Sequence, residues 1–255
     1  MRGAKLIISV FIHTILILLI SYSASGETSE ADWPAPVIDS EKYSLLVFNI
    51  LEYETARSNP SLNWDIGGWY GGDINRLWIK TQGSSTISNS KSAEADLQIL
   101  YGRLMTAFFD AQIGLRLDQA WVDKQNSTSR ISVVVGTEGL ALYFFQLEAA
   151  LFLSDAGQIS GRFSVSKDFL LTQKAIVQAR LETNAAATRS SEFEKGQGIN
   201  DISPGIRIRY EFRREFAPYI GLSQSNLFGE TADYRTSKGG ESSELSAVAG
   251  FRMWY

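Results

Sequence analysis

The chain has 255 residues, a formal net charge of −4 at pH 7, no cysteine and a single histidine. Without cysteine, disulfides and thiolate metal sites are excluded. The sequence shows no basic patch for nucleic acid, so we expect no nucleic-acid partner.

Residues 1–26 are predicted to be a cleaved signal peptide. Arg2 and Lys5 provide a basic start, an apolar run follows, and the small residues Ala24 and Gly26 precede a cleavage point before Glu27. The alternative is an uncleaved membrane helix, but a membrane span needs about 20 apolar residues and this run is shorter. After cleavage, the chain would start near Glu27 with 22 Lys and Arg against 28 Asp and Glu.

The histidine content bears on catalysis. His13 lies within the predicted signal, so the mature chain would contain no imidazole. Lipases and proteases commonly use an imidazole as general base, and a serine paired with a lysine is the alternative that the composition leaves open. We therefore expect a protein that is not an enzyme.

The next segment, residues 27–42, is predicted to be an extended periplasmic arm, because Pro34 and Pro36 disfavour helix in the residues before them. From Tyr43 onward, apolar and polar residues alternate with a period of two, which predicts strands. We predict twelve, at residues 43–55, 64–72, 75–82, 94–103, 109–118, 130–138, 144–153, 159–166, 174–184, 205–213, 216–224 and 245–255.

The last predicted strand shows the alternation clearly. One face carries apolar side chains, namely Leu245, Ala247, Ala249, Phe251, Met253 and Tyr255. A strand of this length crosses a bilayer when it is tilted, with one face toward lipid and the other toward a lumen. Phe251, Met253 and Tyr255 are predicted to form the C-terminal signal that the barrel-assembly machinery reads.

These patterns together predict an all-β fold, a transmembrane antiparallel up-and-down β-barrel of about 12 strands over residues 43–255, surrounded by lipid of the bacterial outer membrane. Barrels of this class have short turns at the periplasmic end and longer loops outside. The sequence predicts long outer loops at 83–93, 185–204 and 225–243, and inner turns near Asp73, Met105, Gly139, Asp168 and Arg214. The hairpin at Ser154 is an exception, being short on the outer side.

The polar faces of the strands predict a charged lumen. The inward set is Asp65, Arg76, Lys80, Asp96, Asp110, Arg116, Arg130, Glu138, Glu148, Arg162, Arg180, Glu182, Arg207, Arg209, Glu211 and Arg252. Both signs are interspersed, so one interpretation is a plug of ion pairs, with Arg116, Arg162, Arg180, Arg207, Arg209 and Arg252 as the main basic partners. The other interpretation is a selective channel or ligand site. Replacing Glu211 with leucine is expected to weaken the barrel, because Arg207, Arg209 or Arg213 would lose a partner.

Aromatic residues near the predicted strand ends are expected to form girdles at the lipid headgroups. They are Trp64, Tyr70, Trp78, Tyr101, Phe109, Tyr143, Tyr210, Phe216, Tyr219 and Tyr255.

Several stretches contain distinctive sequences that the alternation of a barrel strand does not by itself require. They are LEYET (51–55), WDIGGWYGGDINRLWIKTQG (64–83), TEGLALYFFQLEAALFLSDAGQISGRF (137–163), KDFLLTQKAIVQARLETNAAA (167–187) and GINDISPGIRIRYEFRREFAPYIGL (198–222). Over about Pro36–Tyr255 the chain resembles the copper resistance protein B family. The resemblance implies an outer-membrane barrel that acts in copper binding, homeostasis and resistance at the cell envelope, with periplasmic copper-resistance proteins as partners.

The chain departs from the family in its copper-binding residues. Members often carry a segment rich in methionine and histidine before the barrel, whereas residues 27–42 contain neither residue. Copper prefers imidazole, thiolate and thioether ligands, and the methionines after the signal are Met105, near a predicted turn, and Met253, on the lipid face. The remaining candidates are lumen carboxylates, each either a weak Cu(II) ligand or a partner in an ion pair: Asp96, Asp110, Glu148, Glu182 and Glu211. Copper is thus expected from the resemblance alone, and the alternative function is a passive porin-like or structural barrel without a copper site of its own.

Overall fold

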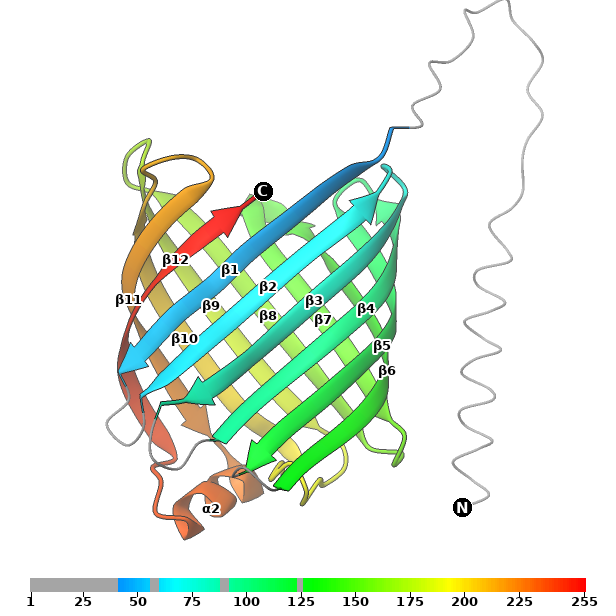
Figure 1. Cartoon of the computed structure of the whole chain (residues 1–255), viewed down its shortest axis with the longest axis vertical. Coiled ribbons are helices and arrows are strands. Elements are labelled where there is room, and N and C mark those ends of the chain that lie inside the picture. The colour runs from blue at the N-terminus through cyan, green and yellow to red at the C-terminus, as the bar shows by residue number, and fades with distance from the viewer. Residues whose placement is uncertain (1–40, 56–59, 88–91, 123–125) are drawn as a thin grey trace, which may run out of the picture. The chain divides into compact units, whose positions relative to one another are not determined.

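The computed structural model describes residues 41–55, 60–87, 92–122 and 126–255. The predicted signal peptide and almost all of the predicted arm lie outside the described residues. The described part is a closed antiparallel barrel of twelve strands, in which each strand pairs with its neighbours in sequence and β1 pairs with β12 (Figure 1). The predicted fold class is confirmed.

The strands are β1 (Tyr43–Thr55), β2 (Ser61–Gly71), β3 (Asn75–Thr86), β4 (Ser92–Thr106), β5 (Phe109–Val122), β6 (Asn126–Ala141), β7 (Phe145–Ser154), β8 (Ile159–Leu170), β9 (Ala175–Ala186), β10 (Gly198–Tyr210), β11 (Phe216–Leu227) and β12 (Ser243–Trp254). A 3₁₀ turn, η1 (Leu142–Phe144), joins β6 to β7, and the helix α2 (Gly229–Ser237) lies between β11 and β12. None of the helices in the described ranges has the length and apolarity of a membrane span.

The two ends of the barrel differ. At one end, here called the turn end, strands are joined by residues 72–74, 107–108, 142–144, 171–174 and 211–215, and at the other, the loop end, by longer connections that include 187–197 and 228–242. Figure 1 shows α2 at the loop end and the C-terminus at the turn end. The predicted contrast between short turns and long loops is confirmed for the connections 187–197 and 228–242 and for the short hairpin after Ser154. It was wrong for 83–93, because the connection there is 87–91 and has the same length as the turn 211–215.

Several predicted strand ends were wrong by a few residues. Met105, Gly139 and Asp168 lie inside β4, β6 and β8 rather than in turns. On the loop side, β3 and β5 continue beyond the predicted loop starts at Gly83 and Gln119. Backbone ladder hydrogen bonds continue after the side-chain pattern fades, so the pattern underestimates strand length.

The predicted end of the loop 185–204 was also wrong, because the connection covers only residues 187–197. β10 begins at Gly198 and includes Pro204, which pairs with Leu181 of β9. Proline does not donate a ladder hydrogen bond, so its position favoured a loop in the sequence. A register shift between Ile199 and Asp201 accompanies this irregular start of β10.

Side chains alternate between the lumen and the outside along each strand. In β12, Leu245 is 62% exposed whereas Ser246 and Val248 are buried, as the sequence predicted. Outward-facing Leu, Ile, Val and Phe side chains form an apolar outer wall, typical of a surface that contacts lipid. Inside, Leu100, Val134 and Phe152 form a buried cluster against Trp78 and Ala150 on one wall.

Two of the predicted girdle residues point inward instead. Tyr219 is buried and its hydroxyl donates to Glu52 Oε2 over 3.0 Å. Trp78 packs against the apolar cluster in the lumen, with the Lys80 ammonium 5.3 Å from its ring centre. Tyr70, Tyr101, Tyr210, Phe216 and Tyr255 are exposed on the outside, as expected for a girdle.

Candidate functional site

The candidate site is the lumen. The predicted inward set occupies inward positions of the strands, with one exception: Glu211 follows the end of β10 and belongs to the turn 211–215, so it is not a mid-strand residue. The burial pattern and ion pairs identify four further inward carboxylates, Glu52, Asp118, Asp168 and Asp201.

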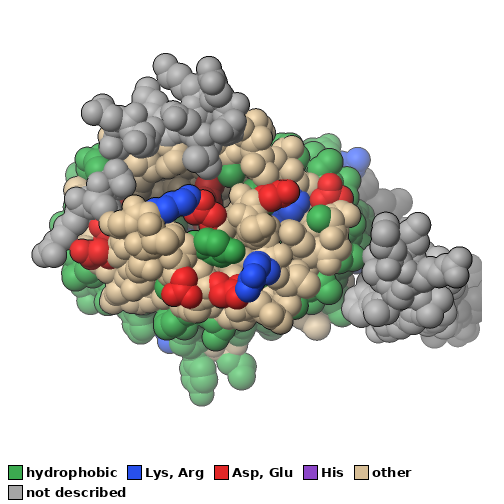
Figure 2. All heavy atoms as spheres, turned by 90° about the horizontal axis from the view of Figure 1, so that it is seen from below, with side chains coloured by type: hydrophobic (Ala, Val, Ile, Leu, Met, Phe, Trp, Pro, Cys, Tyr) green, Lys and Arg blue, Asp and Glu red, His purple; other side chains and the backbone are tan. Residues whose placement is uncertain are grey.

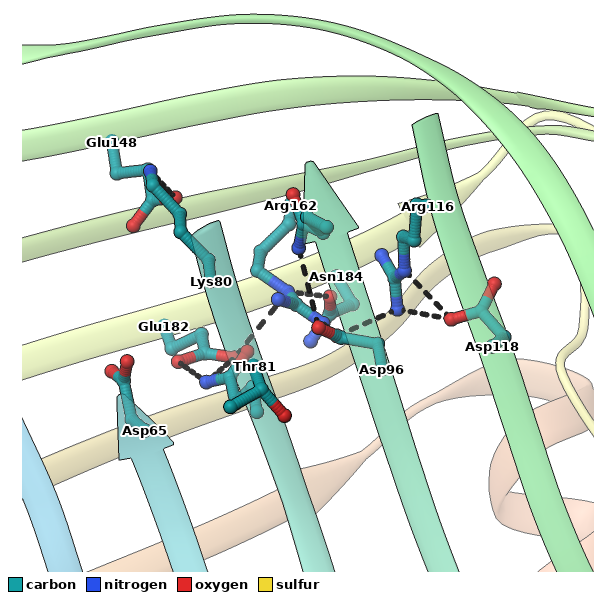
Figure 3. Close-up of polar contacts among 12 residues, drawn as sticks. Asp65, Lys80, Thr81, Asp96, Arg116, Asp118, Glu148, Arg162, Glu182 and Asn184 are labelled. Atoms are coloured by element: carbon teal, nitrogen blue, oxygen red, sulfur yellow. Dashed lines mark hydrogen bonds and ion pairs between the residues drawn. The ribbon is translucent and has the colours of Figure 1, made fainter. Parts of the chain in front are cut away.

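Eight of these residues form one continuous chain of alternating charge, here called the ion-pair chain. Figure 3 shows its middle part, with Glu182, Arg162, Asp96, Arg116 and Asp118 labelled. In order, the chain runs Asp65, Arg180, Glu182, Arg162, Asp96, Arg116, Asp118 and Arg130, with nitrogen–oxygen distances of 2.8, 3.0, 3.8, 3.0, 3.1, 2.6 and 3.0 Å. Four carboxylates face four guanidinium groups, so the chain has no net charge.

The ion-pair chain crosses the lumen instead of following one wall. Asp65 lies on β2 and Arg180 on β9, while Arg162 on β8 reaches Asp96 on β4. Gln82 of β3 also donates to Glu182 of β9 over 3.3 Å, and β3 and β9 stand opposite each other in the ring of strands. These contacts hold opposite walls of the barrel together.

Phe152 of β7 fixes the position of two of the guanidinium groups. Arg116 stacks 4.2 Å from the centre of its ring and Arg162 lies 5.8 Å from it. Since Phe152 is anchored in the buried cluster with Leu100 and Val134, it offers a rigid aromatic surface for both cations. The apolar wall thus orients the arginines that cross the lumen.

A second group of charges lies toward the turn end. The Lys80 ammonium contacts Glu138 at 2.6 Å and Glu148 at 2.7 Å, and it donates to Gln112 over 3.1 Å. Glu138 and Glu148 are direct partners across β6 and β7. Like charges in that arrangement repel, so the lysine is what allows both carboxylates to face the lumen.

A third group lies on β10. Arg207 makes a two-pronged ion pair with Glu52, with both nitrogen–oxygen distances at 2.8 Å. Arg209 pairs with Asp168 at 3.0 and 2.6 Å and has Glu211 at 3.9 Å. Within the described ranges Arg252 forms no salt bridge, so it is the member of the predicted basic set that remains outside the pairing.

A cavity of about 560 Å³ lies between the ion-pair chain and the loop end of the barrel. Asp65, Arg162, Arg180 and Glu182 line it, together with side chains from the connections 187–197 and 228–242. Figure 2, which views the barrel from the loop end, shows acidic and basic side chains around this opening.

Among the described residues that line the mouth, acidic side chains outnumber basic ones outside the ion pairs. Within the described residues that line the cavity, Glu54, Glu94, Asp201 and Glu241 have no ion pair, against Lys195 and Arg235 on the basic side. Glu54 accepts a hydrogen bond from Asn63 and Asp201 accepts one from Asn184. A mouth with this excess attracts cations.

The five carboxylates predicted as metal ligands are all engaged with basic side chains. Their partners are Arg116 and Arg162 for Asp96, Arg76 for Asp110, Lys80 for Glu148, Arg180 for Glu182 and, at 3.9 Å, Arg209 for Glu211. In the described parts of the chain, no group of three or more His, Cys, Asp and Glu residues is arranged to hold a metal ion. A metal ligand role for the five stays a prediction.

The C-terminal residues close the barrel. The backbone of Tyr255 exchanges two hydrogen bonds of 2.8 Å with Leu46 of β1. The ring of Phe251 packs 5.8 Å from that of Phe216, and the Tyr255 side chain is 93% exposed. Recognition of Phe251, Met253 and Tyr255 by the barrel-assembly machinery remains a prediction.

Comparison with known proteins gives one family. The sequence model of the family described as "Copper resistance protein B precursor (CopB)" matches residues 42–255. Copper resistance protein B of Escherichia coli is 34% identical over 217 residues, which cover 85% of this chain and 71% of that protein. The copper resistance protein B homolog of Pseudomonas syringae pv. tomato is 33% identical over 225 residues, covering 86% and 72%.

Among solved structures, the KdgM porin aligns with a TM-score of 0.49 and 10% identity over 82% of this chain and 98% of that one. The outer-membrane protein OmpT of Vibrio cholerae aligns with a TM-score of 0.39 and 8% identity over 84% of this chain and 97% of that one.

Proposed function

The chain belongs to the copper resistance protein B family, and on this premise we propose that it is an outer-membrane barrel whose acidic mouth collects copper ions for copper homeostasis and resistance. The observation that carries the proposal is the excess of carboxylates without an ion pair among the described residues that line the loop-end cavity. Loops of this kind face outward in outer-membrane barrels, so the mouth would meet copper from outside the cell. No catalytic step is involved.

The chemistry of the mouth sets the kind of binding. Carboxylate oxygens bind Cu(II) weakly and with little selectivity compared with imidazole or thiolate groups. Copper held this way exchanges quickly, as suits a surface that concentrates the ion. We propose periplasmic copper-resistance proteins as partners of the barrel at its turn end, which faces the periplasm in barrels of this class. We expect the barrel-assembly machinery to recognise Phe251, Met253 and Tyr255.

The test is calorimetric titration of the folded barrel in detergent with Cu(II) and Cu(I), with zinc as the reference ion. We expect weak Cu(II) binding that falls when Glu54, Glu94 and Asp201 are replaced together by their amides. Replacing Glu138 and Glu148 by glutamine serves as the matched control, since these residues lie on the other side of the ion-pair chain. Equal heats from the mouth variant and the native protein would contradict the proposal.

A second function has one observation in its favour. Every carboxylate of the ion-pair chain is neutralised by arginine, which leaves a lumen suited to a structural or porin-like barrel without a copper site. Liposomes that contain the purified barrel distinguish the two. Passage of small sugars as fast as copper favours the passive barrel, whereas copper retention without sugar flux favours copper collection.

A further inference from the structure

The connection between β9 and β10 folds over the loop-end cavity. Its tip is a tight turn closed by two backbone hydrogen bonds between Ser190 and Lys195, of 2.9 and 3.0 Å. Ser190 is buried, and Glu194 at the tip has a positive φ of 53°. A non-glycine residue keeps this backbone conformation when its surroundings hold it in place.

The tip places Phe193 inside the mouth. Phe193 lines the cavity, and the guanidinium carbon of Arg130 lies 4.2 Å from the centre of its ring. Arg130 belongs to β6 and is the terminal member of the ion-pair chain through Asp118, and it also donates to Gln158. The loop therefore reaches from the β9–β10 side across to β6 and rests on the charged network.

The helix α2 clamps the same loop from its other side. Arg189 pairs with Glu230, and Lys238 pairs with Glu194 at the tip. The backbone N–H of Gly196 donates to Thr231 Oγ1 over 2.9 Å, and that hydroxyl donates to Asn200. A Cβ added to Gly196 would come within 2.6 Å of Glu230 Cβ, so the loop and the helix are packed closely.

We infer that the 187–197 connection is a constriction at the mouth of this barrel and that Phe193 determines the size of the solutes that reach the ion-pair chain. A bulky solute has to displace the aromatic ring from Arg130, whereas a hydrated metal ion passes beside it. The inference rests on the proposed function only for the identity of the solute, because a size limit at the mouth operates on any molecule.

The absence of native cysteine makes a direct test possible, because a single introduced cysteine is the sole thiol in the chain. Ser203 of β10 lines the cavity beside Glu182, its partner in the β9–β10 register. The experiment measures labelling of Ser203→Cys in the folded full-length barrel by a small methanethiosulfonate and by a maleimide carrying a polyethylene glycol chain. Ser237→Cys on the exposed end of α2 provides the reference rate.

We expect Phe193→Ala to accelerate labelling by the bulky reagent about tenfold relative to the reference, in line with the loss of one cation–π contact. Labelling by the small reagent should change less than about twofold. Phe193→Tyr keeps the stacking surface and should label at the native rate, and Phe163→Ala on the outer wall should do the same. A heat-induced mobility shift on gels verifies that each variant is folded.

Three results would overturn the inference: bulky labelling that is fast with Phe193 present, bulky labelling that Phe193→Ala leaves unchanged, or a site that neither reagent reaches. The proposed function fails separately, through absence of copper binding in a barrel whose labelling still depends on Phe193.

Discussion

Replacing Glu52 with leucine should destabilise the barrel more than any other loss of one lumen carboxylate. Glu52 and Arg207 are 3% and 6% exposed, and two 2.8 Å contacts join them. The hydroxyl of Tyr219 donates to the same carboxylate. Leucine would leave a guanidinium without a counter-charge and a phenol without an acceptor in a poorly solvated place.

Removing one partner of a buried ion pair costs about 3–5 kcal/mol. Glu211→Leu is the matched control, because Glu211 is 3.9 Å from Arg209, which is already paired with Asp168 at 2.6 Å. That variant should lose about 1 kcal/mol or less. The sequence alone predicted that Glu211→Leu would weaken the barrel, but Arg207 pairs with Glu52 in the structure.

The measurement is the free energy of unfolding in urea, with the barrel in phospholipid vesicles. The double variant Glu52→Leu with Arg207→Met should regain most of the loss, since an apolar pair of similar volume replaces a buried ion pair at little cost. Equal losses for Glu52→Leu and Glu211→Leu, or a double variant as unstable as Glu52→Leu, would refute the reasoning.

Three further predictions use other contacts. Lys80→Met should cost about 1–2 kcal/mol in urea unfolding, discounted because Glu138 and Glu148 are about one-third exposed, and Lys80→Arg should cost less. Gly250→Ala should lower stability by about 1–3 kcal/mol because its Cβ would lie 2.3 Å from the Leu51 carbonyl oxygen. The control Gly67→Ala, whose nearest contact is 3.9 Å away, should be tolerated in the same assay. Finally, the hydrogen bonds from Arg189 hold the pKa of the Glu230 carboxyl below its ordinary 4.5. The ion pair between Arg189 and Glu230 is therefore present above pH 4.5 and weakens as the pH falls through the lowered pKa of Glu230. Amide hydrogen exchange in residues 187–197, corrected for intrinsic rates, should then rise in the native protein but not in Glu230→Gln.

The strands were predictable because lumen and lipid demand different side chains on alternate positions. That rule fails at β1. A bulge between Phe48 and Ile50 shifts the inward positions from odd to even residues, which brings Glu52 into the lumen. Alternation counted from Tyr43 gives no warning of such a shift, so the most buried carboxylate of the lumen was missed.

The inward charges were predictable but their partners were not. Arg180 and Asp65 are 115 positions apart in sequence, and they meet because strand tilt and closure bring β9 and β2 together across the lumen. Asp168 was assigned to a turn because the apolar pattern of β8 fades before the strand ends at Leu170. Pairing depends on register and shear, which no local pattern encodes.

Under the proposed function, the pairing also limits where a copper ion would bind. Arginine stays charged at any working pH, so a metal that bound Asp96 would leave Arg116 and Arg162 as unpaired cations beside it. The same argument applies to Glu182 with Arg180 and to Asp118 with Arg130. Displacing such groups in a confined lumen costs more than weak carboxylate coordination returns. Copper is therefore expected at the mouth. There the carboxylates of Glu54, Glu94 and Asp201 face no cation within ion-pair distance in the described structure, and the ion-pair chain lies on the lumen side of the cavity.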